Sequence, residues 1–151
     1  ILVSGALSRS RTNTDRVARY NQFSRSQIAA EAATEKIIAN IGKDFQNYGV
    51  TLVNSRLDTY RNLVPVGSEN SLWSDYEFKD EAGTVNRTTV DWLPLTTNLT
   101  LSVQYQGLRG SAYDVRVVSL ARETTGRFNT VGRNEQTLQL AQVSVKLFGT
   151  P

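Results

Sequence analysis

Two acidic side chains are the best candidates for chemistry in this sequence, because the usual catalytic residues are missing. The chain contains no histidine and no cysteine, which excludes the commonest general base, a thiolate nucleophile and triads built on either residue. Asp75 and Glu77 lie two residues apart in a segment expected to be extended, so both carboxylates would share one face. Such a pair suits a carboxylate-dependent hydrolase or a cation site, and more often forms an exposed strand edge.

Other motifs of enzymes are absent from the sequence. Neither glycine-rich phosphate-binding pattern occurs, and no serine lies three residues before a lysine. The turn-like segment 80–83 lacks the ligand spacing of a calcium loop. We therefore predict a protein that is not an enzyme, with no catalytic residues, no cofactor and no metal ligands. Whether the acidic segment 69–81 binds a cation is left open.

Charge is distributed unevenly along the chain. The net charge is +3, but residues 1–25 carry five arginines against Asp15, a local +4, and residues 69–81 carry five acidic residues against Lys79, a local −4. Oppositely charged segments favour head-to-tail association, although two solvated faces would show the same pattern. No known nucleic-acid-binding motif accompanies the arginines, so we predict no nucleic-acid partner.

Helical periodicity dominates the first third of the chain. From about Thr14 to Tyr48 there is no proline and a single glycine, Gly42, and strong helix formers fill residues 29–36. Apolar residues recur along this segment at helical spacing, which predicts a buried stripe. The predicted core face of the helix consists of Val17, Ile28, Ile38, Ile41, Phe45 and Tyr48.

The rest of the chain predicts a short helix followed by strands. The helix is expected from Thr51 to Leu63, ended by Pro65. Period-two alternation then predicts strands, with a hairpin turn at 80–83 and a bulge at 141–142. The expected strands span residues 76–79, 84–90, 99–103, 113–120 and 136–148. Helices followed by strands indicate an α+β fold: a long N-terminal α-helix, a short helix and an antiparallel β-sheet head.

The long helix is expected to extend beyond the head. Residues 1–48 are predicted as the N-terminal stem helix, and residues 49–151 as the short helix plus β-rich head, packed as one domain with the lower half of the stem. The upper half of the stem would project towards a neighbour or a membrane. The residues predicted to make these assembly contacts are Arg9, Arg11, Arg16, Arg19, Tyr20, Phe23 and Arg25.

The stem sequence resembles one known family. Residues 19–33, with the run Ala-Ala-Glu-Ala-Ala at 29–33, are similar to the stem of bacterial type IV pilin-like proteins of the PilX-type minor-pilin and pseudopilin kind. In that family a hydrophobic segment leads through small polar residues into such a run on one continuous helix. Residues 1–7 would correspond to the end of the hydrophobic segment and residues 12–14 to the polar stretch. The family's cleavage site, most of its apolar segment and its common C-terminal disulfide have no counterpart here.

The resemblance implies a helix that anchors or assembles and a head that faces outward. It implies a place in the cell envelope or on the extracellular surface of a bacterium, with copies of the chain or other subunits of an envelope assembly as partners. It also implies membrane attachment through an apolar segment upstream of Ile1, for which residues 1–7 would be the remnant. A plain solvent-facing end is the alternative for these seven residues.

These observations predict a non-catalytic structural subunit of a pilus-like or pseudopilus-like envelope or surface assembly. It would act by helix packing and by contacts of its head. A phage or secretion-type self-assembling structural subunit, whose helix bundles with copies of itself, is the alternative. A carboxylate-dependent hydrolase built on Asp75 and Glu77 is the remote alternative.

Overall fold

One helix runs along most of the molecule. A computed structural model describes the backbone of residues 2–93, 97–100 and 108–145, and the side chains of residues 13–93 and 112–141. Helix α1 (Leu2–Tyr48) has 47 residues, roughly 70 Å at 1.5 Å per residue. The helix therefore starts upstream of Thr14, where the helical periodicity of the sequence begins. It ends at Gly49, whose φ of 82° lies in the left-handed region that glycine adopts without strain.

Five strands form one antiparallel sheet, in which a single strand pairs with all the others. The strands are β1 (Tyr76–Lys79), β2 (Thr89–Trp92), β3 (Thr97–Thr100), β4 (Leu108–Glu123) and β5 (Val131–Val145). β4 pairs with β5 along one side, and with β1, β2 and β3 in succession along the other. The predicted α+β fold, with a long N-terminal helix, short helical segments and an antiparallel sheet, is confirmed.

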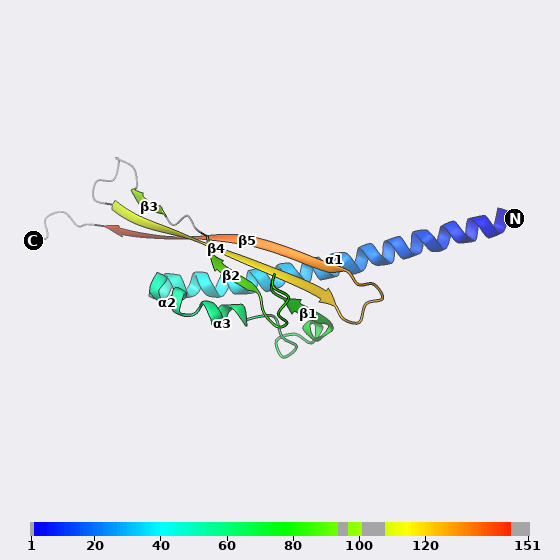
Figure 1. Cartoon of the computed structure of the whole chain (residues 1–151), viewed down its shortest axis with the longest axis horizontal. Helices are drawn as coiled ribbons and strands as arrows, with labels where there is room; N and C mark the ends of the chain where they lie inside the picture. Colours follow the sequence, from blue (N-terminus) through cyan, green and yellow to red (C-terminus); the bar gives the residue numbers. More distant parts are fainter. Residues whose placement is uncertain (1, 94–96, 101–107, 146–151) are drawn as a thin grey trace, which may run out of the picture.

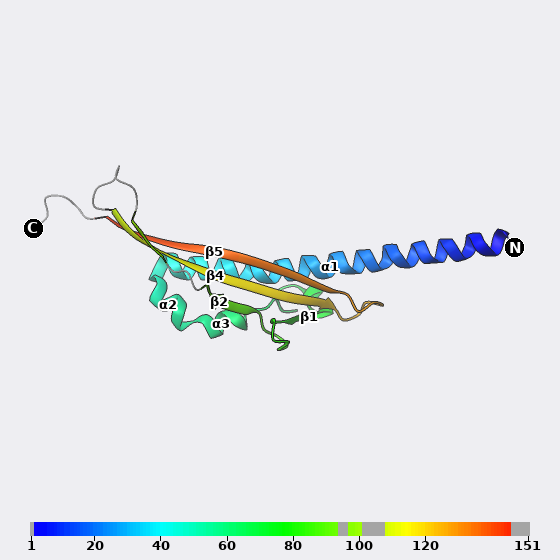
Figure 2. The ribbon, with the colours of Figure 1, turned by 45° about the horizontal axis from the view of Figure 1, so that its top comes forward.

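The helix lies along one face of this sheet, parallel to the β4–β5 hairpin, and its N-terminal part continues past the hairpin end (Figures 1 and 2). Two short helices, α2 (Val50–Ser55) and α3 (Leu57–Arg61), pack beside the C-terminal half of α1. A 3-10 helix, η1 (Ser71–Asp75), leads into β1. The molecule is therefore elongated, with the head gathered around the second half of the stem.

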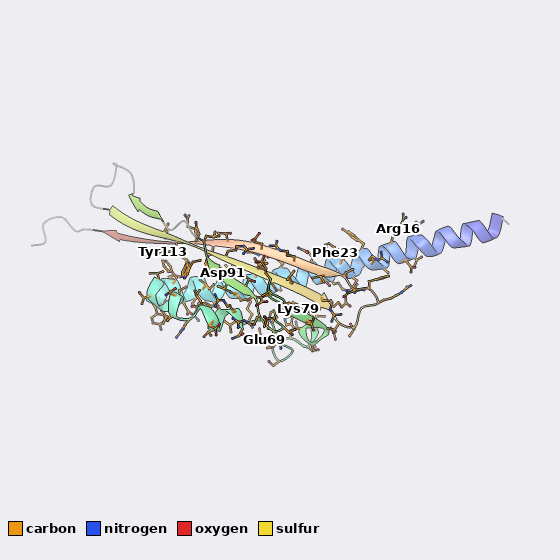
Figure 3. The ribbon with its side chains drawn as sticks, viewed as in Figure 1. Arg16, Phe23, Glu69, Lys79, Asp91 and Tyr113 are labelled. Carbon is orange, nitrogen blue, oxygen red and sulfur yellow. The ribbon has the colours of Figure 1, made fainter. Side chains whose placement is uncertain are left out.

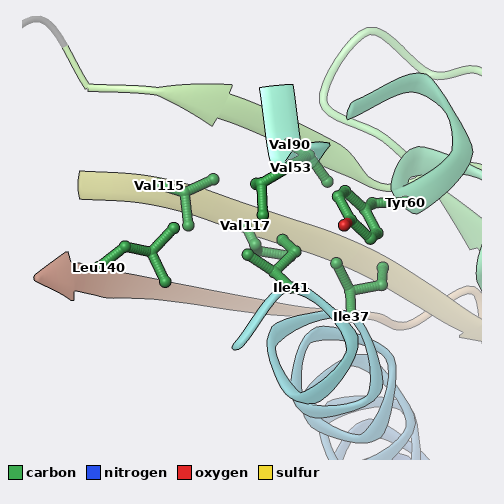
Figure 4. Close-up of a cluster of buried hydrophobic side chains, with 8 residues drawn as sticks. All are labelled: Ile37, Ile41, Val53, Tyr60, Val90, Val115, Val117 and Leu140. Atoms are coloured by element: carbon green, nitrogen blue, oxygen red, sulfur yellow. The ribbon is translucent and has the colours of Figure 1, made fainter. Parts of the chain in front are cut away.

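Large aliphatic side chains fill the core only at the lower half of the stem. Ile37 and Ile41 of α1 pack there between the short helices and the sheet (Figure 4). The cluster consists of Ile37, Ile41, Val53, Tyr60, Val90, Val115, Val117 and Leu140. Burying each of these side chains contributes about 1.5–3 kcal/mol relative to exposure. This cluster fixes the end of the stem on the sheet.

The upper half of the stem packs differently, through small residues. Ala29, Ala30 and Ala33 are buried against Phe78 and Ala121. Further up, α1 lies so close to β5 that a Cβ at Gly132 would sit 2.4 Å from the backbone nitrogen of Gln27. The small side chains let the helix backbone approach the sheet at this end, and polar contacts replace aliphatic packing.

The predicted core face of the helix was partly wrong. Ile41 is buried, and Ile38 and Phe45 are partly buried against the lower cluster. Val17, Ile28 and Tyr48 are instead 59%, 62% and 68% exposed. The buried side of α1 is made of small and polar residues above the lower cluster, because the close helix–sheet contact leaves no room for large side chains. Those residues are Gln22, Ser26, Ala29, Ala30, Ala33 and Thr34.

Three smaller expectations were also wrong. The single helix predicted for 51–63 is divided at Arg56 into α2 and α3. The turn at 80–83 forms, with the Gly83 N–H donating to the Asp80 carbonyl at 3.0 Å, but the next strand begins at Thr89 rather than at residue 84. β1 and β2 each pair with β4 rather than with one another. No bulge interrupts 141–142, where Ala112 pairs with Ala141 and the register continues.

Candidate functional site: the exposed surface of the long helix

The residues predicted to make assembly contacts share the upper half of the stem. Arg16, Arg19, Tyr20, Phe23 and Arg25 are all exposed on α1. Arg16 and Phe23 lie above the sheet, near and beyond the hairpin end (Figure 3). Arg9 and Arg11 lie on the same helix, but their side chains fall outside the described residues. The structure thus brings the described members together on one accessible stretch.

Some of these side chains are already engaged within the chain. The Arg25 guanidinium donates to the Glu123 carboxylate at 2.8 Å, and the Arg19 guanidinium lies 4.9 Å from the centre of the Phe128 ring. Both contacts tie the helix to the end of the β4–β5 hairpin. Arg16 and Tyr20, by contrast, form no ion pair or ring contact with another described residue. These two side chains are available to a partner.

An apolar stripe crosses the solvent side of the stem. Val17 and Tyr20 are 59% and 68% exposed, and Ile28 is 62% exposed. Their spacing of three and then eight residues places them on one side of the helix, away from the sheet. Phe23, 42% exposed, lies on the flank of this stripe. We call Val17, Tyr20 and Ile28 the stem stripe. All three side chains leave large apolar groups exposed to solvent.

The acidic segment 69–81 is largely neutralised by the chain itself. Glu69 pairs with Lys36, which joins the segment to the stem. Glu77 lies 3.2 Å from the Lys79 ammonium and 3.6 Å from Arg122. Three of the five acidic residues, Glu69, Glu77 and Glu81, are therefore paired with cations of the chain.

An ionic cluster of two arginines and two glutamates lies on the sheet face opposite α1. Glu81 accepts hydrogen bonds from Arg116 at 2.6 Å and from Arg133 at 2.9 Å, and both arginines also contact Glu135. The guanidinium groups of Arg116 and Arg133 hold the pKa of the Glu81 carboxyl below its ordinary value. Arg116 and Glu135 lie on β4 and β5, so the cluster fixes the 80–83 turn across the sheet.

The predicted carboxylate pair does not form on one strand. Asp75 is the last residue of η1, whereas Glu77 lies on β1. The Asp75 carbonyl accepts from the Thr124 N–H at 2.8 Å, and Glu77 is held by its two cations. Among the described residues no group of three or more acidic side chains could hold a metal ion. No described helix has an apolar stretch long enough to cross a bilayer.

Two glutamines that the sequence analysis missed connect the stem to the hairpin. Gln22 and Gln27 each bond both the N–H and the carbonyl of one hairpin residue, Phe128 and Arg133 respectively. Gln22 is 2% exposed. Polar residues on a helix carry no apolar signal, so hydrophobic periodicity passes over them. Small and polar residues recur at positions 22, 26, 30 and 34, and counting them together would have identified the side of the helix that faces the sheet.

Comparison of the sequence and structure with protein-family models, curated proteins and solved structures gives no match.

Proposed function

We propose that this chain is a non-catalytic structural subunit of a pilus-like or pseudopilus-like envelope assembly, in which neighbouring subunits pack through the stem. The observation that carries the proposal is the stem stripe: Val17, Tyr20 and Ile28 are more than half exposed on the side of α1 away from the sheet. Exposed apolar side chains that recur along one helix face are typical of helix–helix contact.

The architecture supports the same proposal. Helix α1 has 47 residues, but none of its residues before Ile37 belongs to the lower core cluster. The helix is therefore longer than packing against that cluster requires. The hairpin end still holds the stem at Asp15, which lies 3.0 Å from Arg127. Beyond that contact the helix continues alone (Figure 1). Such a projecting helix fits a subunit whose stem enters an assembly while the head remains outside.

The proposed setting follows from the resemblance of the stem. In the envelope or on the surface of a bacterium, an apolar segment upstream of Ile1 would attach the stem to the membrane. The partners would be copies of this chain or other subunits of the assembly. The ion pair between Arg25 and Glu123 joins the stem to the hairpin end of the head.

The experiment replaces the stem stripe in the full chain. The triple variant Val17→Ser, Tyr20→Ser and Ile28→Ser should fold normally, because all three side chains are exposed, but lose self-association in sedimentation and filament-forming assays. The matched control is Val85→Ser, Tyr48→Ser and Leu72→Ser, which removes equivalent exposed side chains elsewhere. Equal association of both variants would refute the proposal.

Electron microscopy of the assembled chain separates the proposal from its alternative. A filament in which the stems run side by side in one direction supports the pilus-like subunit. A closed ring or a tube of self-bundled helices would instead favour a phage or secretion-type structural subunit, which would use the same stem stripe.

A further inference from the structure

The two edges of the sheet differ in how their outward-facing backbone groups are covered. On the side of the short strands, outward backbone groups are covered by the chain itself. The Phe78 carbonyl of β1 accepts from the Asn86 N–H at 2.9 Å. The Val90 carbonyl of β2 accepts twice from the Arg61 guanidinium, at 3.1 and 2.8 Å. Capping of this kind prevents another strand from pairing with an edge.

Within the described part of the chain, the β5 edge is covered at Arg133 alone. The Gln27 side chain donates to the Arg133 carbonyl at 2.6 Å and accepts from the Arg133 N–H at 3.0 Å. Both backbone groups of Arg133 therefore point away from β4. In an antiparallel strand every second residue points the same way. The backbone groups of Glu135, Thr137, Gln139 and Ala141 must then face the open edge as well.

No partner within the described chain covers these later positions. Among the described residues, the backbone of Thr137, Gln139 and Ala141 forms no hydrogen bond outside the β4–β5 ladder. Their side chains are also exposed. Residues 136–145 contain no charge, no proline and no glycine, so the usual residues that discourage edge pairing are missing.

We propose that β5 is a strand-addition site for a second copy of this chain, which pairs antiparallel with it through its own β5. A two-fold axis near Gln139 would set Thr137 of each copy opposite Ala141 of the other. Glu135 would face Val143, so no like charges meet. The β5 strand of each copy then pairs with the outward-facing backbone groups of the other. A two-fold interface requires this self-complementarity.

This pairing goes beyond the proposed function and does not rest on it. α1 and β5 run in the same direction along the molecule (Figures 1 and 2). Antiparallel β5 strands therefore place the two stems in opposite directions, whereas stems that pack in a polar filament run the same way. Loss of the stem stripe should leave the β5 dimer intact, and loss of the β5 edge should leave stem contacts intact.

Sedimentation of the full chain with a charged edge tests the proposal. The double variant Thr137→Lys and Gln139→Lys places like charges across the two-fold axis and should weaken the dimer at least about tenfold. The matched control, Thr51→Lys and Gln46→Lys, adds the same charges at exposed positions on α1 and α2 and should dimerise as the parent does. A monomeric parent chain, or equal dimerisation of both variants, overturns the proposal.

Spin labels then test the orientation. Because the chain has no cysteine, Gln139→Cys or Val131→Cys introduces a single labelling site. An antiparallel pair should give a short distance between labels at position 139 and a separation of roughly 50 Å between labels at 131, from about 3.4 Å per residue along each strand. Similar short distances at both positions would mean parallel strands and would overturn the antiparallel assignment.

Discussion

The side-chain amide of Gln27 and the backbone of Arg133 bond in both directions, across 106 positions of sequence. One turn higher on the helix, Gln22 makes the same pair of bonds with Phe128, whose N–H donates to the glutamine oxygen at 2.9 Å. Gln27 thus takes the place that a strand next to β5 would occupy at Arg133, whereas Gln22 bonds Phe128 in the loop between β4 and β5. Together they join the stem to the hairpin where aliphatic packing is absent.

Removing these glutamine contacts should loosen the hairpin end. Gln22→Ala leaves the partly buried Phe128 backbone groups without their partner and should lower the free energy of unfolding by about 1–3 kcal/mol, and Gln27→Ala, at a more exposed site, by about 1 kcal/mol. Amide exchange at Phe128 and Arg133, followed by NMR, should accelerate in the respective variants. Gln46→Ala, an exposed glutamine of the same helix, is the control and should change neither quantity.

Close approach of helix and sheet at Gly132 predicts opposite effects for two alanine substitutions. Gly132→Ala would press a methyl group against the backbone of Ser26 and Gln27, 2.4 Å away, and should destabilise the fold by about 1–3 kcal/mol. Gly42 lies in open space on α1, so Gly42→Ala should stabilise the fold by about 0.5–1 kcal/mol. Chemical denaturation measures both. A neutral Gly132→Ala would contradict the close contact.

Two isoleucines of α1 test which face of the helix is buried. Ile41→Ala removes a fully buried side chain of the lower cluster and should cost about 2–5 kcal/mol. Ile28→Ala removes a side chain that is 62% exposed and should change stability by no more than about 0.5 kcal/mol. Thermal or urea unfolding distinguishes the two, and comparable losses would mean that the helix is rotated from the position described.

The ionic cluster around Glu81 predicts a loss of stability in acid. Arg116 and Arg133 hold the pKa of Glu81 below its ordinary value of 4.5. The contribution of this carboxylate is therefore complete above about pH 4.5 and is lost as the pH falls through the lower pKa of the folded state. Glu81→Gln should flatten that part of the stability–pH curve measured by urea unfolding. Glu31→Gln, at an exposed helix position, should leave the curve unchanged.

Local patterns explain the parts of the fold that could be predicted. The helix through residues 14–48 follows from its helix formers and the absence of proline, and the strand at 113–120 follows from its β-branched residues. Both lie within observed elements, α1 and β4. The lower core residue Ile41 was also predicted, because aliphatic periodicity is reliable where a large apolar core exists.

Burial of the upper helix face could not be read from the same pattern. Gln22, Ser26 and Thr34 are polar, and they are buried because polar groups of the hairpin meet them. Those partners lie about 100 positions away in sequence, so no local rule pairs them. Val17 and Ile28 of the stem stripe were assigned to the core for the same reason, since both are apolar and the sheet lies on the other side of the helix.

The sequence by itself determined that the chain has a long helix followed by strands, and that histidine and cysteine chemistry is impossible, because these depend on residue types and near neighbours. Only the tertiary structure decided which side of the helix is covered, which arginine and lysine side chains pair with the acidic residues, and which edge of the sheet is left open. Those outcomes depend on the pairing of β4 with every other strand and on the close approach of α1 to Gly132. Contacts of that kind join residues that are far apart in the sequence.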